Sequence, residues 1–84
     1  MLKIEILGPG CSRCEQVEKT VRQIVQEMAL DAEVTKVKDV SKIAGYGLVY
    51  SPGLAINGKL VHGDGSVPDK ARLTTLITNA LVEQ

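Results

Sequence analysis

Short runs of alternating apolar and polar side chains predict four β-strands in this chain. The runs cover residues 1–7, 32–37, 53–56 and 59–62. In the second run, Val34 and Val37 are the candidates for inward-facing positions. The last two runs flank Asn57-Gly58, the strongest two-residue hairpin signal in the sequence, so we expect them to form a β-hairpin.

Apolar residues at helical spacing predict two long helices and a short one. The stripe of the first long helix, at about 12–28, consists of Val17, Val21, Ile24, Val25 and Met28. The stripe of the last helix consists of Leu73, Leu76, Ile77, Ala80 and Leu81. Asp39 or Ser41 would cap the short helix near 40–44. The run Ser66-Val67-Pro68-Asp69 is expected to cap the last helix, with Ser66 as the cap, Pro68 at the start of the helix and Asp69 at the N3 position of a capping box.

These elements follow the order β-α-β-(α)-β-β-α, which predicts an α/β fold with a mixed four-stranded sheet flanked by helices. A chain of 84 residues without repeats or linkers is expected to form a single domain over residues 1–84. Its hydrophobic content of 44% is enough for a core. That core must be aliphatic, because Phe and Trp are absent and the only aromatic residues are Tyr46 and Tyr50.

Charge and hydropathy narrow the classes of partner and the compartment. Ten basic residues balance ten acidic ones, which gives no indication of nucleic-acid binding or of an anionic membrane surface. No apolar run approaches the roughly 20 residues of a membrane span. The first residues lack the basic stretch and apolar core of a signal peptide, so we expect a cytoplasmic protein. For so small a fold we expect a monomer.

The strongest chemical signal is the pair Cys11 and Cys14, which stands between the first predicted strand and the first predicted helix. At this junction the first thiol lies at a helix N-terminus, where the helix dipole and free N–H groups stabilise a thiolate. The two-residue spacing lets the second thiol attack a mixed disulfide made by the first. In the cytoplasm such a pair is expected to be redox-active or metal-binding rather than a structural staple.

The positions of the two thiols predict different chemical roles for them. Cys11 is the expected nucleophile, with a pKa below the free value of about 8.5. Arg13 adds a positive charge that favours its thiolate, and Ser12-Arg13 between the cysteines would tune the redox potential. Cys14, about one turn into the helix, would then attack Cys11 Sγ. Gly10 would keep the first thiol uncovered, although an ordinary loop explains it equally well.

With Cys11-Ser12-Arg13-Cys14 before the first helix and Ser51-Pro52 before the hairpin, the chain resembles the thioredoxin fold over its whole length. It is most similar to the minimal archaeal and bacterial redox-active disulfide proteins, and glutaredoxins share the same core. The resemblance implies a cis peptide bond before Pro52, packed against the disulfide. It also implies that Ser51 offers its backbone to an extended substrate segment. The ring of Tyr50, beside Ser51 in the chain, either packs in the core or faces the substrate.

The resemblance further implies a disulfide-containing substrate protein, an electron-donating reductase or glutathione, and no cofactor besides the disulfide. The chain departs from the family's patterns. Gly10 stands where thioredoxins carry Trp, Ser12-Arg13 replaces Gly-Pro, and the glutaredoxin Cys-Pro-Tyr-Cys is absent. No match is found for the buried acidic residue of thioredoxins. Gly63-Asp64-Gly65 lies where a glutathione clamp would be sought.

Two other classes compete with an oxidoreductase. Two thiolates at this spacing can hold Cu(I), as in small copper carriers, although that family ends in a strand and has no role for Ser51-Pro52. A redox-sensing binding module would use the same exchange chemistry. A structural zinc site is not expected, because His62 cannot complete a four-ligand set. The simplest interpretation places His62 at the surface or in a cap, and Tyr46 in the core.

Overall fold

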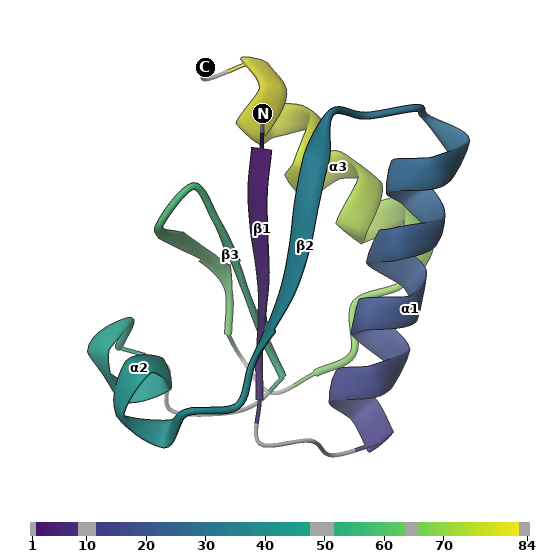
Figure 1. Ribbon diagram of the computed structural model, residues 1–84. Helices are drawn as coiled ribbons and strands as arrows, with labels where there is room; N and C mark the ends of the chain where they lie inside the picture. Colours follow the sequence, from purple (N-terminus) through teal and green to yellow (C-terminus); the bar gives the residue numbers. More distant parts are fainter. Residues whose placement is uncertain (1, 9–11, 48–51, 64–65, 83–84) are drawn as a thin grey trace.

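In the residues that the computed structural model describes (2–8, 12–47, 52–63 and 66–82), four strands form one sheet (Figure 1). The strands are β1 (Leu2–Leu7), β2 (Ala32–Val37), β3 (Gly53–Ile56) and β4 (Lys59–His62). Their order across the sheet is β2-β1-β3-β4. The central strand β1 runs parallel to β2 and antiparallel to β3, and β3 runs antiparallel to β4. The prediction of a mixed sheet is therefore confirmed.

The helices of the described residues cover both faces of this sheet. They are α1 (Ser12–Glu27), α2 (Val40–Gly45) and α3 (Lys70–Val82). Figure 1 shows α1 and α3 together on one side of the strands and α2 on the other. Strands and helices thus follow one another in the predicted order, and the sheet is flanked by helices as expected.

Side chains that alternate along the strands build a separate apolar cluster on each face of the sheet. The first cluster joins the sheet to α1 and α3 through Leu2, Ile4, Ile6, Val17, Val21, Ile24, Leu54, Ile56, Leu73 and Ile77. The second cluster lies on the α2 side and consists of Leu7, Val37, Ile43 and Ala55. Val34 packs against the first cluster and Val37 belongs to the second, because residues three apart in a strand point to opposite faces.

The hairpin between β3 and β4 turns where the sequence predicted it. Asn57 and Gly58 have φ values of 54° and 82°, the positive values that a two-residue type I′ turn requires at both positions. Asn57 also ties the turn to β1. Its N–H donates to the carbonyl of Lys3 over 2.8 Å, and its Oδ1 accepts the N–H of Lys3 over 3.0 Å.

Aspartates cap the helices α2 and α3. Asp39 caps α2 by accepting the N–H of Ser41 over 2.9 Å, as predicted. The predicted start of α3 is wrong, because the helix begins at Lys70. Asp69 is the cap rather than the third helical residue, because its carboxylate accepts the N–H of Arg72 over 2.8 Å. Buried Pro68 lies just before the cap and buried Leu73 is the fourth helical residue, the spacing of a hydrophobic staple.

A polar contact accompanies the second cluster. The hydroxyl of Tyr46, the residue that ends α2, donates to Oε1 of Glu5 in β1 over 2.5 Å. The Tyr46 ring is partly buried against the second cluster, which agrees with the prediction that it packs in the core. This hydrogen bond, together with burial and the negative charge of Glu5, raises the pKa of Tyr46 above its ordinary value of 10.0.

The raised pKa of Tyr46 predicts a loss of stability in alkali. A group whose pKa is higher in the folded chain stabilises the fold fully below its unfolded pKa, and the stabilisation is lost as the pH rises through the folded pKa. We expect the free energy of unfolding of wild type to exceed that of Tyr46→Phe at about pH 8 and to converge on it above about pH 10. Urea unfolding at several pH values measures both, and a difference that stays constant with pH would contradict the assignment.

Candidate active site

The register between β1 and β3 brings two predicted site segments to one end of the sheet. Leu7, the last residue of β1, pairs with Gly53, the first residue of β3. Pro52 immediately precedes Gly53, and Gly8 immediately follows Leu7, so both lie at this end. Gly8 is buried, and its N–H donates to the carbonyl of Val37 at the end of β2 over 3.0 Å. The chain between Gly8 and the start of α1 contains Cys11.

Cys14 lies in the first turn of α1 and is completely buried, with a relative exposure of 0%. It shares the buried face of the helix with Val17, Val21 and Ile24, which are members of the first cluster. Ser12 and Arg13, which precede it in the same turn, are exposed. The apolar stripe that forms α1 therefore also places the second thiol of the pair inside the protein.

Pro52 is fully buried at the entrance to β3. Since proline has no N–H, it is tolerated at the first position of a strand, and it is followed by buried Gly53. The other predicted site residues, Gly10, Cys11, Tyr50 and Ser51, lie outside the described residues. Their roles, and the predicted cis bond before Pro52, stay predictions.

Charged side chains along α1 pair with one another beside the site. Glu15 and Glu18 lie 3.9 Å and 3.7 Å from Nζ of Lys36 in β2, and Glu18 also binds Arg22 at 3.0 Å. Arg22 in addition donates to the carbonyl of Val34 over 3.2 Å. These contacts join the outer, solvated face of α1 to β2.

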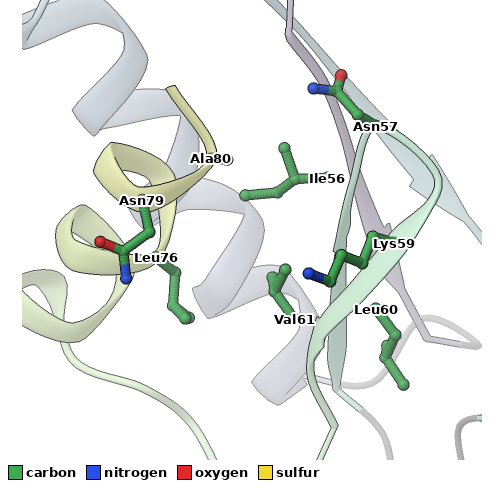
Figure 2. Close-up of a pocket in the computed structure, with 8 residues that line it drawn as sticks. All are labelled: Ile56, Asn57, Lys59, Leu60, Val61, Leu76, Asn79 and Ala80. Carbon is green, nitrogen blue, oxygen red and sulfur yellow. The ribbon is translucent and has the colours of Figure 1, made fainter. Parts of the chain in front are cut away.

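A cavity elsewhere in the fold is not part of this site. It has a volume of about 520 Å³ and lies between the β3–β4 hairpin and α3 (Figure 2). Its walls come from Ile56, Asn57, Lys59, Leu60, Val61, Leu76, Asn79 and Ala80. None of the residues that the sequence analysis assigned to the site is among them.

His62, the one histidine of the sequence, makes a contact within a loop. Nε2 of His62 lies 3.0 Å from the carbonyl oxygen of Ser66, which agrees with a histidine near the surface that serves a loop. Asp64 and Gly65 of the predicted turn lie outside the described residues. Within the described ranges, no cluster of three or more His, Cys, Asp or Glu side chains could hold a metal ion. In the same ranges, no helix is long and apolar enough to span a membrane.

Comparison with known proteins agrees with this class of fold and site. A model of the thioredoxin domain family matches residues 2–78, and the chain belongs to this family. Thioredoxin of Methanothermobacter thermautotrophicus is 45% identical over 60 residues, which cover 71% of this chain and 78% of that protein. Thioredoxin of Methanocaldococcus jannaschii is 40% identical over 68 residues, which cover 81% of this chain and 77% of that protein.

Solved structures with little sequence similarity share the fold. A malarial protein superposes with a TM-score of 0.70 at 14% identity, covering 96% of this chain and 98% of the other. The J-Trx1 fragment of ERdj5 superposes with a TM-score of 0.61 at 22% identity, covering 96% of this chain and 43% of the fragment. The predicted thioredoxin-like fold is therefore confirmed, and the family supports thiol–disulfide oxidoreductase activity as a class.

The burial of Cys14 predicts that its thiol is protected in the native, reduced protein. Alkylation requires an accessible thiolate, so we expect iodoacetamide to modify Cys14 at least about tenfold more slowly in the native state than in urea. Peptide mass mapping of samples quenched over time measures the rate at Cys14 itself, and the unfolded protein is the control. Equal rates in the two states would show that the thiol is not buried in solution.

Proposed function

We propose that this protein is a thiol–disulfide oxidoreductase that reduces or exchanges disulfides in partner proteins through Cys11 and Cys14. The observation that carries the proposal is the buried thiol of Cys14 in the first turn of α1. It lies on the helix that starts where β1 ends, the end of the sheet at which Pro52 enters β3. Membership of the thioredoxin family supports the same class of chemistry.

The reaction is two successive thiol–disulfide exchanges. The Cys11 thiolate attacks one sulfur of the substrate disulfide and forms a mixed disulfide, while the other substrate sulfur leaves as a thiolate and takes up a proton. The Cys14 thiol then loses its proton and attacks Cys11 Sγ, which releases the second substrate thiolate. Two electrons pass from the protein to the substrate, the two substrate thiolates take up protons from Cys14 and from the solvent, and a Cys11–Cys14 disulfide remains.

The burial of Cys14 suits the second of these exchanges. A buried thiol is shielded from external disulfides and oxidants, so it does not compete with Cys11 for the substrate. Its position three residues after Cys11 gives it a high effective concentration toward the mixed disulfide once that has formed. The intramolecular attack therefore releases the substrate before a second partner can bind.

Substrate binding would use the segment that leads into β3. Tyr50, Ser51 and Pro52 are the proposed contacts, with the backbone of Ser51 pairing with an extended stretch of the partner protein. The buried Pro52 cannot itself donate an N–H, so strand pairing at this point would depend on its neighbour. Gly10, Ser12 and Arg13 would support the reactive thiol from the other side.

The catalytic cycle needs an electron donor to reduce Cys11–Cys14 again, and we propose a reductase or glutathione in that role. The dithiol is the only redox group that the cycle requires, and no flavin, nicotinamide or metal enters it.

We further propose that the protein acts as a monomeric single domain in the cytoplasm, where its partners would be kept reduced.

Substitution of the two cysteines separates their roles. We expect Cys14→Ser to accumulate a mixed disulfide with insulin, because the second exchange is blocked, and Cys11→Ser to accumulate none. Each variant should lose at least about a hundredfold in the rate of insulin reduction by dithiothreitol, since the two thiols act as one unit. Non-reducing gels and intact mass measure the adduct, and the double variant is the control.

Two outcomes would count against this assignment. If Cys11→Ser trapped insulin as well as Cys14→Ser does, the roles of the thiols would be wrong. If wild type formed no disulfide and reduced no insulin, the Cu(I) carrier that uses the same cysteines would replace the oxidoreductase, and Cu(I) titration would follow.

A further inference from the structure

A hydrogen bond on the second face ties the end of α2 to the centre of the sheet. The hydroxyl of Tyr46 reaches Oε1 of Glu5 over 2.5 Å although 41 residues separate the two in the chain. Glu5 lies in the middle of β1, where it pairs with Thr35 on one side and Ala55 on the other. A partly buried carboxylate in a central strand costs free energy unless it is hydrogen-bonded, and the Tyr46 hydroxyl offsets that cost.

The helix α2 has few other contacts to hold it. Of its six residues, all within the described part of the chain, Ile43 is the only buried one. Val40 in its first turn is 69% exposed. Such a short helix has little stability of its own and depends on tertiary contacts. Tyr46 supplies a second anchor, through its ring against the second cluster and through its hydroxyl on Glu5.

This anchor lies close along the chain to the site. Gly47, the residue after Tyr46, has a φ of 82°, and its N–H donates to the carbonyl of Ala44 over 2.9 Å. The chain then reaches buried Pro52 and enters β3 after only four more residues. The β3 end of this connection is fixed because Gly53 pairs with Leu7. The α2 end is fixed where Tyr46 binds Glu5.

We propose that Tyr46 and Glu5 are positioning residues for protein substrates. Their hydrogen bond fixes Tyr46 on β1, six residues before buried Pro52 in the chain, and so favours the binding of a protein disulfide beside Pro52. This inference rests on the proposed function. The pair has no role at the reacting sulfur atoms, so it affects the binding of protein substrates and leaves exchange with a small disulfide unchanged.

The test compares a protein disulfide with a small one. Insulin reduction by dithiothreitol gives KM and kcat, and single-turnover reaction of the reduced protein with dithionitrobenzoate gives the exchange rate alone. We expect Tyr46→Phe, which keeps the ring and loses the donor, to raise KM for insulin about five- to tenfold with kcat within about twofold. The rate with dithionitrobenzoate should stay within about twofold of wild type.

Substitutions at Glu5 and at a distant hydroxyl complete the test. Glu5→Gln keeps an acceptor for Tyr46 and should raise KM less than Glu5→Leu, and the effects of Tyr46→Phe and Glu5→Leu should not add. Thr75→Ala is the matched control, since it removes a hydroxyl whose bond, 3.0 Å to the carbonyl of Ala71, stays within α3. Its KM for insulin should equal that of wild type.

The possible failures can be told apart. An unchanged KM in Tyr46→Phe overturns the inference. Equal losses with insulin and dithionitrobenzoate also overturn it, because they would show a general loss of structure. If wild type itself reduced neither disulfide, the proposed function would fail, whatever the variants did.

Discussion

The antiparallel pairing of β3 with the central strand β1 is the constraint on which the site depends. It sets Gly53 opposite Leu7, so the chain leaves β1 toward Cys11 at the same end of the sheet where Pro52 enters β3. A register slip of one residue would turn the inward side chains of β3 to the other face and expose the first cluster. The apolar residues that stabilise the fold therefore also determine which segments meet at the candidate active site.

The helix α1 connects this core to the proposed chemistry. The stripe that buries Val17, Val21 and Ile24 also buries Cys14, while Ser12 and Arg13 stay exposed in the same turn. One amphipathic pattern therefore packs the helix against the sheet. The same pattern buries the Cys14 thiol and leaves the two preceding residues exposed. The core consists almost entirely of aliphatic side chains. The site is therefore built on elements that pack through this core rather than on a loop alone.

Local signals in the sequence predicted the helices and strands well. Contacts between residues far apart in the chain could not be predicted from such signals. The amphipathic stripe of α1 and the turn at Asn57-Gly58 depend on neighbouring residues. The turn is as predicted, and the stripe holds from Val17 to Val25, but Met28 lies beyond the end of the helix and is 43% exposed. The start of α3 was misplaced because the run 66–69 holds two good capping residues, and only packing selects Asp69. The Glu5–Tyr46 bond has no local signal, since Glu5 occupies an ordinary polar position in the alternating pattern of β1. The position of Gly8 and Pro52 at one end of the sheet followed only from the family resemblance, since local sequence patterns do not determine strand register.

The reduction potential of the Cys11–Cys14 pair tests the central claim most directly. Equilibration of the protein against glutathione buffers, followed by alkylation and mass measurement, gives the fractions of dithiol and disulfide. An oxidoreductase of this class should show a reversible two-electron couple between about −300 and −120 mV. Failure to form an intramolecular disulfide under oxidising conditions would contradict the account, because the cycle would then have no oxidised state.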